Sequence, residues 1–186
     1  MINFDFNSLY WNKSLIEGYI LGEENLIVTE IPKTEANYKN LCPLSADISE
    51  IKRHFYSIKE ILHSKDQITD VSLLNVSKLN KLKHSERCCF LLQLTHFYVN
   101  NVFTNVEFNT TKEFRSLHHL ANSIISLKME LKDCHSTMRC YCGDQSHQMI
   151  KDFKAEYHKL NTEAAALKAV GDLNILLHWI EKSFLN

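Results

Sequence analysis

Glycine and proline are scarce in this sequence, which has four glycines and two prolines among 186 residues. Both prolines, Pro32 and Pro43, lie in the first quarter of the chain. Beyond Pro43, therefore, no residue forbids a helix on steric grounds. A β-sheet protein of this length needs many turns that contain glycine. The scarcity excludes a mainly β fold and predicts that the body of the chain is all-α.

The sequence also lacks an excess of charge of one sign and a long apolar run. Lysine and arginine number 21, against 22 aspartates and glutamates, so net charge gives no reason to expect nucleic acid or an anionic membrane as a partner. No run of about eighteen apolar residues exists, and such a run is what a membrane-spanning helix requires. We therefore expect neither nucleic-acid binding nor membrane insertion.

Motifs of catalysis are missing as well. We find no phosphate-binding loop, no nucleophile elbow, no HExxH and no convincing pair of carboxylates. The sequence therefore predicts a protein that is not an enzyme and that needs no cofactor.

Residues 1–40 differ from the rest of the chain, because their apolar residues are repeatedly interrupted by charged ones. A secretory signal needs a continuous apolar stretch of about 7–15 residues behind a basic start, and we find none here. We predict that residues 1–40 form a poorly ordered extension, or an alternative start in place of a signal. The folded domain is predicted over residues 41–186.

Apolar residues recur at steps of three and four beyond residue 41, which indicates amphipathic helices with one buried face. The three clearest stripes run over Ile48 to Leu62, Phe114 to Leu131, and Leu167 to Phe184. The segment from Ser85 to Thr104 is apolar on most sides, as expected for a central helix. Five long helices are predicted, with a candidate short helix around Val71 to Leu82. The stripes and Trp179 are expected to form the core.

Four polar residues mark where two of these helices begin, and two glycines call for an explanation. Asp47 with Glu50, and Thr110 with Glu113, have the spacing of helix-capping pairs. We attribute Gly143 to a turn that needs a special backbone angle. We attribute Gly171, inside the last predicted helix, to close packing of a neighbouring helix.

Six cysteines in tight clusters indicate disulfides formed in an oxidising compartment. They are Cys42, Cys88, Cys89, Cys134, Cys140 and Cys142. Adjacent cysteines cannot close on each other without strain, and the two of the Cys-x-Cys element are also too near. The economical arrangement joins the adjacent pair to the Cys-x-Cys pair and leaves the first cysteine for Cys134. Geometry leaves open which member of one pair joins which member of the other.

The sequence also allows two other states of the cysteines. They are six reduced thiols in a cytosolic protein, and a zinc site made by the Cys-x-Cys element with a histidine. Structural zinc prefers cysteines separated by two to four residues, and neither CC nor CxC has that spacing. We therefore expect no metal.

Four segments carry a resemblance to a known family. RCCFLLQLTHFYVNNVF resembles helix C of the interleukin-10 family of cytokines, in the branch of interleukins 19, 20 and 24. SLHHLANSIISLKMELKDCHSTMRCYCG is similar to helix D of that branch with its Cys-x-Cys turn, and TEAAALKAVGDLNILLHWIEK to its final helix. LCPLSADISEIKRHFYSIKEILHSKD resembles helix A and the start of the AB loop. The resemblance covers roughly residues 41–186, with Tyr141 where several members have histidine.

The resemblance implies a six-helix bundle, mostly monomeric, with three disulfides. The implied pairings are Cys42–Cys134, Cys88–Cys140 and Cys89–Cys142. It also implies a secreted cytokine that bridges two class II cytokine receptor chains and triggers JAK–STAT signalling. The expected pair is the interleukin-20 receptor alpha and beta chains, or the interleukin-22 receptor with the interleukin-20 receptor beta chain.

By family likeness, one receptor is expected on helix A, the AB loop and the last helix, and the other on exposed parts of helices A and C. The predicted receptor-binding residues are Ser64, Lys65, Asp66, Gln67 and Ile68. Sequons at Asn75 and Asn109 predict glycosylation if the chain is secreted. The alternatives are an intracellular all-α adaptor or metal-binding protein with reduced cysteines, and a receptor-binding decoy.

Overall fold

The computed structural model describes residues 42–66, 68, 71–108, 110–137 and 139–184. The α-helices of these residues are α2 (Ile48–Lys65), α3 (Val76–Lys81), α4 (Arg87–Phe97), α5 (Thr111–Ser136), α6 (Asp144–Lys159), α7 (Thr162–Gly171) and α8 (Leu173–Phe184). A single residue, Asp172, separates α7 from α8, so these two are the halves of one bent helix. With them taken together, the predicted six-helix, all-α fold is confirmed. The predicted extension over residues 1–40 lies outside the described residues.

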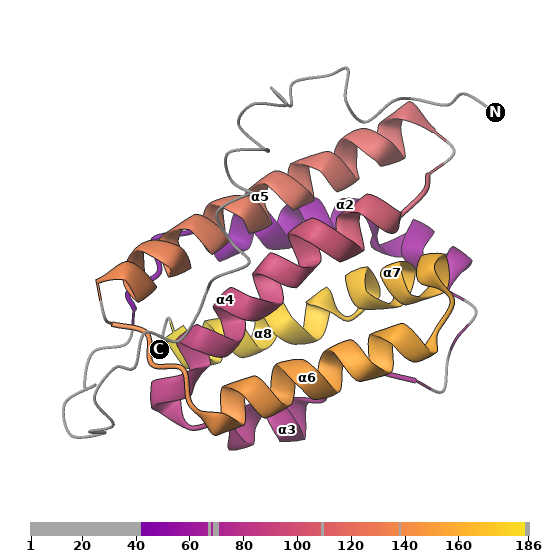
Figure 1. Ribbon diagram of the computed structural model, residues 1–186. Coiled ribbons are helices and arrows are strands. Elements are labelled where there is room, and N and C mark those ends of the chain that lie inside the picture. The colour runs from indigo at the N-terminus through magenta and orange to yellow at the C-terminus, as the bar shows by residue number, and fades with distance from the viewer. Residues whose placement is uncertain (1–41, 67, 69–70, 109, 138, 185–186) are drawn as a thin grey trace. The chain divides into compact units, whose positions relative to one another are not determined.

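The central helix of the bundle is α4, as its apolar sequence predicted. It crosses the middle of Figure 1, with α5 on one side and α6 on the other. Cys89, Phe90, Leu91 and Leu94 are completely buried. The helix continues through a π-helical turn, Tyr98–Val102, and then a short 3-10 turn. Eight of the eleven residues of this helix are buried, and only Arg87, Gln93 and His96 are partly exposed.

The predicted stripes and helix starts are found in the structure. The five apolar residues of α2 and most of those of α5 and α8 are buried, and Trp179 packs edge-on against Phe90. At the start of α2 the carboxylate of Asp47 accepts hydrogen bonds from the next turn. Thr110 and Glu113 form a reciprocal capping box at the start of α5. Local sequence therefore sets where these helices begin.

The three disulfides join the pairs that the resemblance implied. Cys42 is bonded to Cys134, Cys88 to Cys140 and Cys89 to Cys142, with Cα–Cα distances of 5.7, 5.3 and 5.1 Å. The first bridge ties the start of α2 to the end of α5. The other two tie the start of α4 to the turn between α5 and α6. No free cysteine remains, which contradicts the alternative with reduced thiols.

Both explanations of the glycines were wrong. Gly143 has φ −110° and ψ −176°, an extended backbone that any residue adopts. A Cβ there would lie 2.5 Å from the carboxyl carbon of Glu86, so an alanine at this position would displace that buried carboxyl group. A Cβ on Gly171 would meet nothing within 4 Å, so no neighbouring helix requires a glycine at that position.

Candidate functional site

The segment that follows α2 is fastened to α7 by one lysine. Lys168 Nζ donates to Asp66 Oδ2 at 3.1 Å and to the backbone oxygen of Ile68 at 2.6 Å. Asp66 also accepts, through Oδ1, a hydrogen bond from the backbone N–H of Ile68 at 3.0 Å. The Lys168–Asp66 ion pair is largely buried, because the two side chains are 11% and 18% exposed. The beginning of the loop therefore has a defined position on the last helix.

A buried carboxylate fastens the end of the same segment. Asp172, between α7 and α8, is 8% exposed. Its Oδ2 accepts hydrogen bonds from the backbone N–H groups of Leu73 at 2.7 Å and Leu74 at 3.0 Å, and from Ser72 Oγ at 3.1 Å. Burial raises the pKa of Asp172, although these hydrogen bonds and Lys168 act in the opposite direction. The bend in the last helix thus holds the incoming loop.

The raised pKa of Asp172 gives a pH dependence that can be measured with Asp172→Asn. Because its pKa is raised, the Asp172 carboxyl group binds a proton more tightly in the folded protein than in the unfolded chain. The contribution of Asp172 to stability is therefore greatest below the ordinary aspartate pKa of 3.8 and falls as pH rises through the raised pKa. Asparagine can present one oxygen to the same three donors and has no proton to lose. We therefore expect the stability of Asp172→Asn relative to the wild type to increase as pH rises from about 3 to 7.

Urea unfolding followed by circular dichroism at several pH values measures this difference. Asp47→Asn is the control, because hydrogen bonds from the Ser49 side chain and the Glu50 backbone lower the pKa of Asp47. Its contribution is lost as pH falls, so the relative stability of Asp47→Asn should change with pH in the opposite sense. A flat difference for Asp172→Asn would contradict the prediction.

An exposed tyrosine on α2 contacts α8, the helix that begins after Asp172. Tyr56 is 50% exposed, and its hydroxyl donates to Asn174 Oδ1 on α8 at 3.4 Å. Lys59 Nζ lies 5.6 Å from the centre of the ring. A further contact between α2 and α8 is the ion pair of Lys52 with Glu181 at 2.5 Å. The two helices therefore present an aromatic ring in a fixed orientation.

Of the predicted receptor-binding residues, Ser64 and Lys65 are the last two of α2, and Asp66 and Ile68 lie just beyond it. Several of them are engaged within the chain. Lys65 Nζ donates to the backbone oxygen of Glu107 at 3.0 Å and lies 5.0 Å from the centre of the Phe108 ring. Ser64 is exposed, although its hydroxyl donates to the backbone oxygen of Ile61. Asp66 and Ile68 make the contacts to α7 described above, and Gln67 lies outside the described residues. As receptor contacts these residues remain predictions.

Three residues of this site were not singled out from the sequence. The sequence did hold a signal for Tyr56. It is an aromatic residue next to Phe55 that does not belong to the apolar stripe of α2. Lys168 and Asp172 gave no such signal, since their partners lie about a hundred residues away in the chain. Of the predicted glycosylation sites, Asn75 is exposed at the start of α3, whereas Asn109 lies outside the described residues.

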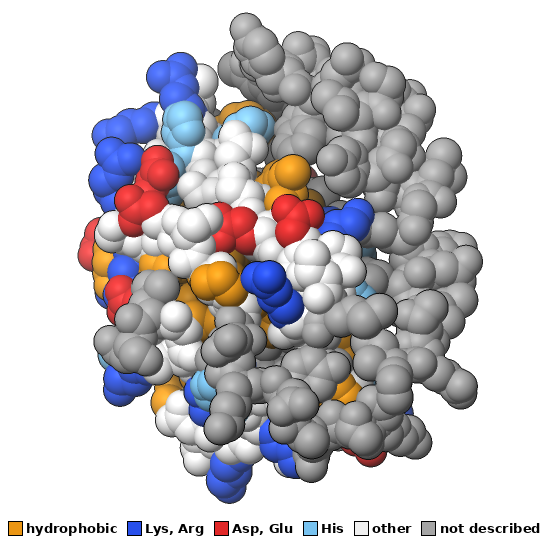
Figure 2. Space-filling model, turned by 90° about the vertical axis from the view of Figure 1, so that its left-hand side faces the viewer, with side chains coloured by type: hydrophobic (Ala, Val, Ile, Leu, Met, Phe, Trp, Pro, Cys, Tyr) orange, Lys and Arg blue, Asp and Glu red, His pale blue; other side chains and the backbone are white. Residues whose placement is uncertain are grey.

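The surface of the described residues is mixed in chemical character. On the face drawn in Figure 2, basic and acidic side chains are intermixed and hydrophobic ones form small separate areas. Among the described residues no three histidine, cysteine or acidic side chains are placed to hold a metal ion. None of the helices in the described part of the chain is long and apolar enough to cross a membrane.

Comparison with known proteins gives a consistent result. The sequence profile of the family described as Interleukin 10 matches residues 28–185. Interleukin-20 of Mus musculus is 30% identical over 158 residues, which are 84% of this chain and 90% of that protein. Interleukin-19 of Mus musculus is 30% identical over 144 residues, 77% of this chain and 82% of its own. The crystal structure of human interleukin-19 superposes with a TM-score of 0.70 at 29% identity, covering 79% of this chain and 95% of that one.

Proposed function

Because this chain belongs to the interleukin-10 family, whose members are cytokines that act through class II cytokine receptors, we propose that it is a secreted cytokine that bridges two such receptor chains. The proposed pair is the interleukin-20 receptor alpha and beta chains, or the interleukin-22 receptor with the interleukin-20 receptor beta chain. JAK–STAT signalling in the target cell would follow. The similarity to interleukins 20, 19 and 24 supports this choice of receptors.

The observation that carries the proposal is that α7 and Asp172 hold residues of the segment after α2, while α8 bonds to the exposed Tyr56. Lys168 bonds to Asp66 and Ile68. Asp172 bonds to Ser72, Leu73 and Leu74, so the described residues at both ends of the segment have fixed positions against α7 and α8. A surface that is already ordered loses less conformational entropy when it binds a partner. Exposed tyrosines are also enriched among the residues that dominate binding energy. We assign the first receptor chain to this surface.

The second receptor chain is assigned to exposed parts of α2 and of the end of α4. Most of α4 is buried, which leaves few candidates on it. His96 is half-buried and bonded to Asn100, and Asn100 and Asn101 are exposed in the π-helical turn. Two receptor chains bound to different faces of one rigid bundle would be brought together on the cell surface.

The test is binding and STAT phosphorylation on cells that carry each receptor pair, for the wild type and Tyr56→Ala. We expect the wild type to bind and signal through an interleukin-20 type pair. Loss of a tyrosine anchor costs about 1–2 kcal/mol or more, so Tyr56→Ala should weaken binding roughly tenfold. Met129→Ala is the matched control, because Met129 is also 50% exposed but lies on α5. It should bind as the wild type does.

Three outcomes would contradict the proposal. Absence of binding to every class II pair would remove the cytokine function. Binding without STAT phosphorylation would make the protein a decoy. Equal losses for Tyr56→Ala and Met129→Ala would place the receptor away from the assigned surface.

A further inference from the structure

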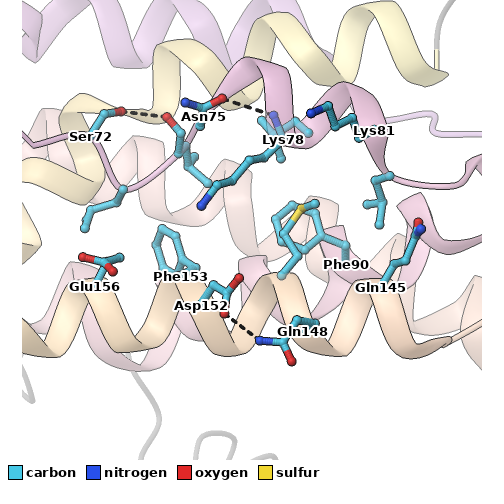
Figure 3. A pocket seen from close by; sticks show the side chains of 15 residues that line it. Ser72, Asn75, Lys78, Lys81, Phe90, Gln145, Gln148, Asp152, Phe153 and Glu156 are labelled. Carbon is cyan, nitrogen blue, oxygen red and sulfur yellow. Dashed lines mark hydrogen bonds between the residues drawn. The ribbon is translucent and has the colours of Figure 1, made fainter.

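A groove between α3 and α6 adjoins the proposed receptor surface at Ser72, Leu73 and Leu74, but its other lining residues lie outside both proposed receptor surfaces. Its volume is about 440 Å³, and Figure 3 shows side chains of both helices directed into it. The floor is apolar and is made by Leu74, Leu79, Leu82, Phe90, Met149 and Phe153. The rim is polar, with Lys78 and Lys81 on α3 and Gln145, Gln148 and Asp152 on α6. A ligand with both an apolar face and many hydrogen-bonding groups would suit this lining.

Asn75, at the edge of this groove, begins the sequon Asn75-Val76-Ser77. It is exposed and is the N-cap of α3, because its Oδ1 accepts a hydrogen bond from the backbone N–H of Lys78 at 3.1 Å. This bond fixes the orientation of the side-chain amide. N-linked glycosylation modifies the other amide atom, Nδ2, so Asn75 can cap the helix and carry a sugar together.

The residue after Asn75 points to the same modification. Val76 is 45% exposed, although it is a large apolar residue in the first turn of a helix. It is one of three large hydrophobic residues that the described part of the chain leaves exposed. A sugar attached to Asn75 would cover Val76 and so remove apolar surface from water.

We propose that Asn75 carries an N-linked glycan whose first sugars lie in the groove between α3 and α6. The C–H faces of the sugars contact Met149 in the groove, and the sugar bonded to Asn75 also covers Val76, which lies outside the groove lining. Their hydroxyl and acetamido groups bond to Lys78, Gln148 and Asp152. Attachment at the rim keeps the sugars at an effective concentration in the millimolar range, so contacts too weak to hold a free sugar are enough.

The glycan is attached to Asn75 by group transfer. This step requires that the chain be secreted, as the proposed function states. An oligosaccharide donor linked to a lipid through pyrophosphate supplies the sugar. A bond forms between Asn75 Nδ2 and the anomeric carbon of the first N-acetylglucosamine. The bond from that carbon to the pyrophosphate oxygen breaks, the lipid pyrophosphate leaves with the electron pair, and the amide loses one proton.

The test compares hydrogen exchange of α3 in protein secreted from mammalian cells behind a heterologous leader. Ser77→Ala removes the sequon but keeps the Asn75 cap, and Ser77→Thr keeps both. Glycopeptide mass spectrometry should find sugar on Asn75 in the wild type and in Ser77→Thr. The backbone amides of α3 should exchange several-fold more slowly in these two proteins than in Ser77→Ala. One of them is the N–H of Leu79, which donates to the backbone oxygen of Asn75 at 2.9 Å.

Variants of the groove residues distinguish a glycan that lies in the groove from one that is only attached to Asn75. Gln148 donates to Asp152 at 2.7 Å, and both are exposed on α6. The pair Gln148→Ala/Asp152→Ala should abolish the slower exchange of the glycosylated protein but leave exchange in the Ser77→Ala background unchanged. Lys151→Ala is the control, since Lys151 is exposed on the same helix but does not line the groove.

An unmodified Asn75 would overturn the proposal. So would a glycan that leaves exchange of α3 unchanged, or one whose effect survives the groove variants. All these measurements are made without a receptor and with a supplied leader. Failure here would therefore leave the receptor proposal standing, and failure to bind receptors would leave the glycan result intact.

Discussion

Replacing Cys42 and Cys134 together by serine is expected to lower the free energy of unfolding by about 4–5 kcal/mol. The two cysteines are 92 residues apart in the chain, so their bridge strongly restricts the unfolded state. Cys42 is also buried, and a serine hydroxyl there gains no comparable contact. Typical domains have about 5–15 kcal/mol of stability in total. Urea unfolding followed by circular dichroism, with the wild type kept oxidised, measures the loss.

The double serine variant should be less stable than the wild type but should keep the same fold. Glu130 on α5 still holds the start of α2, because it accepts hydrogen bonds from the backbone N–H and hydroxyl of Ser45, both at 2.9 Å, and from the backbone N–H of Ala46 at 3.1 Å. We therefore expect native helical content in the absence of urea. Ser45→Ala keeps the disulfide and two of these three bonds, and is the control for the same junction. A loss below about 1 kcal/mol for the double serine variant would contradict the argument from chain entropy.

The parts of the fold that the sequence predicted are those that short-range chemistry decides. The stripe of α2 and the capping box at Thr110 and Glu113 depend on residues three or four positions apart, and such spacing is legible in one sequence. The approximate boundaries of the helices followed from it. The disulfide pairs followed from the family resemblance, because geometry alone left two of them open.

The contacts that build the candidate site were not predictable in this way. Asp172 bonds to Leu73, 99 residues earlier, and no local spacing signals a partner at that distance. Lys65 and Asp66 look like solvated loop charges in the sequence, yet the fold engages both within the chain. The bend between α7 and α8 is also invisible to periodicity, since the apolar stripe continues through it. Long-range hydrogen bonds depend on the packed bundle and not on the neighbouring sequence.

Gly143→Ala is expected to lower the free energy of unfolding by about 2–4 kcal/mol, from overpacking and a lost hydrogen bond together. Glu86 is 2% exposed, and its Oε2 accepts a hydrogen bond from the backbone N–H of Ser146, in the first turn of α6, at 2.8 Å. A carboxylate at this end of a helix is stabilised by the unpaired N–H groups there. The new Cβ would overlap the carboxyl group, so Glu86 must move and α6 loses its cap.

A double-mutant cycle with Glu86→Ala tests this cause directly. Glu86→Ala alone should be destabilising, because it leaves Ser146 N–H without its acceptor. Once the carboxyl group has been removed, however, adding Gly143→Ala should lower the free energy of unfolding by well under 1 kcal/mol, because the new Cβ no longer clashes with that group. Gly171→Ala is the matched control: the same substitution in open space should raise stability by up to about 1 kcal/mol. Additive costs in the cycle would mean that Gly143 is required for a reason other than the approach of Glu86.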